Sequence, residues 1–135
     1  MRKYIKTSLF FLFVFSFTTY AQITSVEKRE LRKNTVVKEW NTEGNRRWLD
    51  HITVFNENGQ RIEDIEYAVY GQKERITYEY DEVGQCIKEV IYDNRNKPYR
   101  IRKYEYFENG LKKKQLNYFP NGKLYSTKVF EYTEE

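Results

Sequence analysis

The sequence predicts an all-β protein, an antiparallel meander of about seven to eight short strands in a twisted or rolled single sheet, following an N-terminal signal peptide. Two observations predict the sheet. An aromatic residue is followed four places later by glycine, and this pair recurs about every dozen residues. Between the pairs, apolar and polar residues alternate, as expected for strands with two distinct faces.

The first 21 residues have the three parts of a secretory signal peptide. Three basic residues come first, Leu9 to Phe17 form an apolar run, and small residues at Thr19 and Ala21 mark a cleavage site. We expect cleavage after Ala21 and export to the periplasm or the extracellular space. The run is too short to cross a bilayer of roughly 30 Å as a helix, so no transmembrane segment should remain; an uncleaved anchor is the alternative.

Removal of the signal peptide changes the charge of the protein. The chain has 24 basic and 20 acidic residues, and residues 1–21 hold three of the basic ones and none of the acidic ones. The remainder therefore has 21 basic and 20 acidic side chains, a formal charge of +1. Because phosphate binding requires clustered positive charge, we expect no nucleic-acid partner. The short run Lys112 to Lys114 is interpreted as a solvated strand face.

The glycines of the repeat mark turns. A type I turn followed by a residue in the left-handed conformation is a common hairpin connection, and glycine or asparagine suits that last position. Asn56, Asp81 and Asp93 occupy the starting position that such turns favour. The predicted turn residues are Gly44, Gly59, Gly71, Gly84, Asn96, Gly110 and Gly122.

The segments between these turns are the expected strands. They lie near residues 50–55, 60–67, 74–80, 85–92, 98–106, 112–118 and 124–132, with another near 35–40. The repetitive sheet domain is assigned to 35–135. Residues 22–34 could form a short helix, a strand or a frayed tail. Both faces of the strands carry some apolar side chains, which favours a rolled single sheet over a sandwich; closure into a small barrel is the second choice.

The step between aromatic residues is 13 from Tyr67 to Tyr80, and 12 or 14 at the neighbouring turns. An odd step moves side chains to the other face of a sheet. We therefore predict an irregularity within residues 68–75 that restores a shared face. The rings expected on that face are Tyr67, Tyr80, Tyr92, Tyr106 and Tyr118.

Two stretches resemble known repeat families. "YEYDEVGQCIKEVIYD" resembles the YD repeats of RHS proteins, and "YFENGLKKKQLNYFPNGKLYSTKVFEY" is similar to the MORN-variant repeats of small bacterial proteins, including YwqK-type proteins described as antitoxins. These resemblances cover most of residues 40–132. They imply strand-turn-strand units used as shells or binding sheets, and neither supplies a catalytic residue. Ala68, Phe107 and Phe119 depart from the Tyr-Asp form.

Catalytic and metal-binding motifs are absent from the sequence. His51 and Cys86 are single residues of their kinds, and we interpret them as a strand-start residue and a small packed side chain. No phosphate-binding glycine loop occurs. Four glutamates lie between apolar residues near strand ends and could serve a hydrolase only if two converged; a solvated face is the simpler interpretation. They are Glu66, Glu79, Glu105 and Glu131. We expect no enzyme activity, cofactor or metal.

The aromatic content gives the main functional indication. Residues 22–135 contain 11 Tyr, four Phe and two Trp, and tyrosine suits contact surfaces because its ring is apolar and its tip polar. We expect a non-catalytic binding or scaffold protein that contacts a protein or a polysaccharide; an antitoxin or immunity role of the YwqK type is the alternative, and a hydrolase ranks third. The candidate surface comprises Tyr67, Tyr78, Tyr80, Tyr92, Tyr104, Tyr106, Tyr118 and Tyr132.

Overall fold

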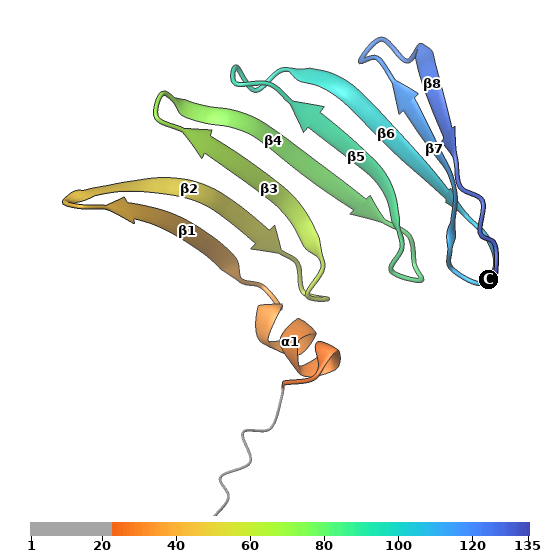
Figure 1. Cartoon of the computed structure of the whole chain (residues 1–135), viewed down its shortest axis with the longest axis horizontal. Coiled ribbons are helices and arrows are strands. Elements are labelled where there is room, and N and C mark those ends of the chain that lie inside the picture. The colour runs from red at the N-terminus through yellow and green to blue at the C-terminus, as the bar shows by residue number, and fades with distance from the viewer. Residues whose placement is uncertain (1–22) are drawn as a thin grey trace, which may run out of the picture.

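The computed structural model describes residues 23–135, and the expected signal peptide lies outside this range. One short helix, α1 (Ser25–Arg32), precedes eight strands (Figure 1). The strands are β1 (Val36–Glu43), β2 (Arg46–Phe55), β3 (Arg61–Ala68), β4 (Gly71–Tyr80), β5 (Cys86–Tyr92), β6 (Pro98–Tyr106), β7 (Lys112–Tyr118) and β8 (Leu124–Val129). The predicted strands are all present, and the undecided segment 22–34 contains the helix.

The eight strands form one antiparallel sheet in the order β1 to β8, so each strand pairs with its neighbours in the sequence. The meander is open: β1 and β8 are its two edges and do not pair with each other. Figure 1 shows the hairpins side by side, with strands that bend as they cross the sheet. The predicted single sheet is confirmed, and the alternative of a closed barrel is wrong.

The turns follow the predicted chemistry. In the turn after β2, the Gly59 amide donates to the Asn56 carbonyl and the Asn56 amide donates to the Gln60 carbonyl. The same backbone pattern occurs in the turns that begin at Asp81, Asp93, Phe107 and Phe119. All six glycines have positive φ, and Asn96 replaces glycine with a φ of 61°. Asparagine therefore fills the left-handed position as expected.

A side chain accepts a backbone amide in both kinds of turn, but its position differs. Where Asp starts the turn, that residue is the acceptor: the Asp81 carboxylate accepts from the Gln85 amide at 2.8 Å. Where phenylalanine starts the turn, the Asn109 and Asn121 side chains accept a backbone amide two residues later. An Asx-type bond thus forms in both kinds of turn and explains why the Tyr-Asp pair is dispensable.

Every hairpin also contains a β-bulge in its second strand. In the β2–β3 pair, Phe55 lies opposite Arg61 and Val54 opposite Glu63, so Ile62 has no partner. The equivalent unpaired residues are Asp50, Lys73, Ile87, Tyr99, Lys113 and Tyr125. One extra residue per hairpin moves the following side chains to the opposite face, because side chains alternate with a period of two.

The prediction of a shared aromatic face is therefore wrong. The expected irregularity is present: Tyr67 lies opposite Gln72, five places later, and Lys73 is bulged. It does not restore a common face, because every other hairpin is bulged as well. Residues that lie opposite each other share a face, which divides the rings into two sets. Tyr78, Tyr80, Tyr104 and Tyr106 lie on one face; Tyr67, Tyr92 and Tyr118 lie on the other.

We name the two faces by their central residues. The polar face carries Thr53, Asp64, Glu89, Arg102 and Asn117, and the apolar face carries Val54, Val90, Ile101, Tyr118 and Leu124. Among the described residues, four side chains are buried, all on the polar face: Ile91 (2% exposed), Thr53, Asn117 and Tyr104. Neighbouring side chains of the same face contact them: Thr53 bonds to Asp64, and Asn117 bonds to Ser126.

Helix α1 lies beside the turn between β2 and β3. Its N-terminus has a capping box, in which Thr24 and Glu27 each accept the other's backbone amide. The Arg29 Nε donates to the Asn58 carbonyl at 2.8 Å, and the helix backbone at Arg29 passes so close to Gly59 that a side chain there would collide with it. The helix therefore contacts the turn, and its Arg32 guanidinium lies 5.4 Å from the ring centroid of Phe55 at the end of β2.

Candidate functional site

Three candidate tyrosines act as structural links across the sheet. Tyr80, Tyr106 and Tyr132 are spaced 26 residues apart, and each hydroxyl donates to a backbone carbonyl at the start of the preceding strand. The acceptors are Arg61 at 2.6 Å, Cys86 at 2.5 Å and Lys112 at 2.9 Å. These bonds join the two strands of a pair beyond the point where their backbone ladder ends, so the hydroxyls have a structural role that sequence reasoning missed.

The polar face carries a series of paired charges. Asp64 is bonded to His51 Nε2 at 2.7 Å, to the Thr53 hydroxyl at 3.0 Å and to Arg61 Nη1 at 3.2 Å. Further along the sheet, Arg102 Nη1 contacts Glu89 at 3.2 Å. These contacts provide partners for the half-buried carboxylates and link β2 to β3 and β5 to β6. Their role is structural.

Tyr78 and Tyr104 also lie within this polar network. Burial raises the pKa of Tyr78, and the neighbouring Arg61 opposes that increase. Burial raises the pKa of Tyr104 further, with added contributions from the Glu89 carboxylate. Both phenols therefore stay neutral at physiological pH and serve as hydrogen-bonding groups. Tyr104 is nearly inaccessible, which removes it from the candidate contact surface.

The apolar face presents a row of residues that crosses the entire sheet. Each residue lies directly opposite the next, and Glu63 is the one charged member. The row is Val36, Val54, Glu63, Thr77, Val90, Ile101, Tyr118 and Leu124. Its interior members are half-buried, and its two ends, Val36 and Leu124, are exposed. The row is a continuous surface that no other described element covers.

Aromatic rings on the apolar face are paired with cations. The Arg75 guanidinium lies 3.9 Å from the ring centroid of Tyr92, and it also contacts Glu63 at 2.8 Å. The Lys103 ammonium lies 5.2 Å from the Tyr118 ring, and the Arg47 guanidinium lies 4.4 Å from Trp40. Each cation occupies one face of its ring, which leaves less flat aromatic surface free for stacking.

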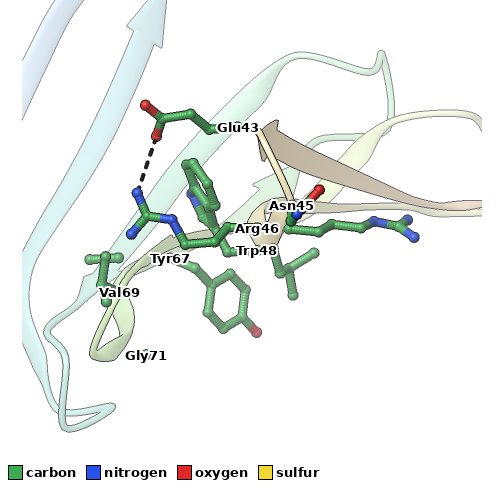
Figure 2. Close-up of a pocket in the computed structure, with 10 residues that line it drawn as sticks. Glu43, Asn45, Arg46, Trp48, Tyr67, Val69 and Gly71 are labelled. Carbon is green, nitrogen blue, oxygen red and sulfur yellow. Dashed lines mark ion pairs between the residues drawn. The ribbon is translucent and has the colours of Figure 1, made fainter.

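A hollow of about 830 Å³ lies between the tips of the first two hairpins (Figure 2). It exists because β2 and β3 pair only from His51 and Glu66 onward, so residues 46–50 and 67–68 diverge. Trp48 and Tyr67 line it, and Arg46 at its rim contacts Glu43 at 3.7 Å. This mixture of rings and arginines is typical of protein contact sites, although sequence reasoning placed only Tyr67 among the candidates.

The residues considered for catalysis do not form one site. Glu66 and Glu79 project from opposite faces and are paired with Lys73 and Lys88, respectively. Burial raises the pKa of the half-buried Cys86 thiol, which lowers its reactivity. Within residues 23–135, no cluster of three His, Cys, Asp or Glu side chains is arranged to hold a metal ion.

No helix between residues 23 and 135 is both long and apolar enough to span a membrane. Comparison of the chain with protein-family models and with curated proteins gives no match. The resemblance to YD and MORN-variant repeats remains a prediction from the sequence.

Proposed function

We propose that the protein is an exported, non-catalytic binding or scaffold protein that contacts another protein through the apolar face of its sheet. The single observation that supports this is the row from Val36 to Leu124, which crosses all eight strands without a covering layer. A sheet with an apolar face gains stability when that face packs against another surface. A partner would supply the missing layer.

A protein partner fits this face better than a polysaccharide. Sugar rings stack on open aromatic faces, whereas Arg75 and Lys103 lie over Tyr92 and Tyr118. Apart from Glu63, the members of the row are aliphatic or hydroxyl-bearing side chains, which pack well against another protein. The non-catalytic part of the proposal is supported by the ion pairs that engage Asp64, Glu66 and Glu89. The exported part is supported by residues 1–21 of the sequence.

Site-specific photo-crosslinking in the cells that make the protein tests this proposal. Thr77 and Ile76 are adjacent in β4, and their partners Val90 and Ile91 place them on the apolar and polar faces, respectively. A photoreactive residue at Thr77 should produce a crosslink to one protein species, and the same residue at Ile76 should not. Equal crosslinking from both positions, or none from Thr77, would contradict the proposal. A crosslinked species that resists protease and is removed by glycosidases would indicate a polysaccharide instead.

A further inference from the structure

The two edge strands of the sheet are unusually open. Every residue of β1 and β8 is exposed, including the apolar side chains of Val36, Trp40, Leu124 and Val129. An unpaired edge presents a row of backbone donors and acceptors to any other strand, and natural sheets commonly cover or interrupt such edges. In residues 23–135, neither edge is covered by another element.

The hydrogen bonds identify which backbone groups point outward from β8. The Phe130 amide donates to the Lys113 carbonyl and therefore points toward β7. Backbone groups alternate in direction along a strand, so the N–H and C=O groups of Thr127 and Val129 point away from the sheet. The Tyr132 hydroxyl bonds to the Lys112 carbonyl at 2.9 Å, which draws the C-terminal segment toward β7 and leaves this edge free.

The same argument applies to β1. The Phe55 amide donates to the Thr35 carbonyl, so Thr35 points toward β2. By alternation, the backbone groups of Val36, Lys38 and Trp40 point outward. Helix α1 contacts the turn after β2 through Arg29, and it leaves the outer edge of β1 uncovered.

We propose that β8 of one copy pairs antiparallel with β1 of a second copy, so that the chains associate head to tail. Neighbouring strands are antiparallel throughout the meander. In the proposed contact, β1 of the second copy takes the place that a ninth strand would have beside β8, and it is antiparallel to β8. The outward backbone N–H and C=O groups of Thr127 then bond to those of Trp40 in the second copy, and the groups of Val129 bond to those of Lys38. These outward residues all belong to the apolar face, so both faces continue across the junction.

Charge selects this register. With Val129 opposite Lys38, the side chain of Lys128 lies opposite Glu39 of the second copy, and both are on the polar face. The sheet already uses such a pair between an even and an odd strand: Glu79 lies opposite Lys88, with their charged groups 3.1 Å apart. A shift of two residues would instead place Lys128 opposite Val37 or Asn41 and lose the pair.

Head-to-tail contact leaves one free β1 and one free β8 on every assembly, so association does not stop at a dimer unless the ends meet in a ring. The test uses sedimentation velocity on protein isolated from the cells that make it, so that any signal-peptide removal has already taken place. The wild-type protein should show species larger than a dimer that grow with concentration. Lys128→Glu and Glu39→Lys should each weaken association about ten-fold, since each places like charges opposite one another.

Two combinations distinguish this junction from other contacts. The double variant carrying both reversals should regain wild-type association, and a mixture of the two single variants should associate more tightly than either alone. Lys123→Glu, at the exposed position before β8, is the matched control and should change little. A wild-type protein that stays monomeric overturns the proposal. Two other outcomes also overturn it. In the first, both single variants associate as tightly as the wild type; in the second, the double variant does not regain wild-type association.

Discussion

At the scale of single residues, the tyrosines of the repeat divide into two roles. Tyr80, Tyr106 and Tyr132 use their hydroxyls to hold strand pairs together, whereas Tyr92 and Tyr118 present their rings to cations on the opposite face. The repeat therefore selects tyrosine at alternate positions for two different physical reasons, a polar tip in one set and a π face in the other.

Removal of one linking hydroxyl should destabilise the protein measurably. Tyr106→Phe keeps the ring and removes the bond to the Cys86 carbonyl, so we expect a loss of about 1 kcal/mol in the free energy of unfolding. Urea denaturation monitored by circular dichroism measures it. Tyr118→Phe is the control, because the described residues provide no carbonyl partner for that hydroxyl. Equal losses in the two variants would show that the hydrogen bond has no special role.

Alkaline pH should also weaken the fold. Burial raises the pKa of Tyr80 to about 12, and burial also raises the pKa of Tyr106. An unfolded tyrosine loses its proton near pH 10, so from about pH 10 to about pH 12 the unfolded chain releases protons that the folded chain retains. The free energy of unfolding should therefore fall as pH rises through this range.

Tyr80→Phe should reduce that decline, because it removes one of the groups responsible. Denaturation midpoints measured at a series of pH values, together with tyrosinate absorbance of the folded protein, check both parts. The idea fails if Tyr80→Phe leaves the alkaline decline unchanged.

At the scale of elements, each hairpin contains a turn and a β-bulge. The turn can be predicted from the sequence, and the bulge cannot. The turns are also stacked along one end of the sheet: the Gln60 amide reaches the Gly84 carbonyl at 3.5 Å, and Arg29 of α1 reaches the carbonyl of Asn58 at 2.8 Å. The helix therefore acts as the first member of this stack and lies against the first turn at this end of the sheet, between β2 and β3.

Gly59→Ala should separate the helix from the sheet. A Cβ at this position would lie 2.3 Å from the Arg29 carbonyl oxygen, and φ is +69°. Gly122→Ala is the matched control, since its φ of +89° carries a similar backbone penalty but no atom lies within 4 Å. We expect about 1–2 kcal/mol of destabilisation in the control and a larger loss in Gly59→Ala.

Limited trypsin digestion provides the second measurement. Cleavage after Arg29 or Arg32 should be faster in Gly59→Ala than in the wild type or in Gly122→Ala. Identical cleavage of α1 in both variants would show that the helix does not depend on this contact.

At the scale of the whole molecule, the protein is a single layer whose two faces and two edges all remain accessible. Within residues 23–135, only Ile91 and three other side chains are buried, so cross-strand pairs and hydrogen bonds supply much of the cohesion that a thick core supplies elsewhere. The two proposed contacts, one on the apolar face and one at the edge strands, both use surfaces that a single-layer sheet leaves open.

Processing is predicted at the same scale. The protein recovered from outside the cytoplasm should begin at Gln22, and intact mass spectrometry measures this directly. A protein that retains residues 1–21 would contradict the signal-peptide prediction and favour a membrane anchor.

The sequence determined the strand-turn repeat, because glycine, asparagine and the alternation of apolar residues act over a few neighbouring positions. Gly59, Gly84 and Asn96 were placed correctly from local backbone geometry alone. Tertiary structure decided which face each ring occupies, since a bulge such as that at Ile62 depends on how two strands pair and leaves no distinct residue type in the chain. It also decided that the sheet stays open. Closure depends on the summed twist and bending of eight strands, a property of the whole sheet that no short stretch of sequence encodes.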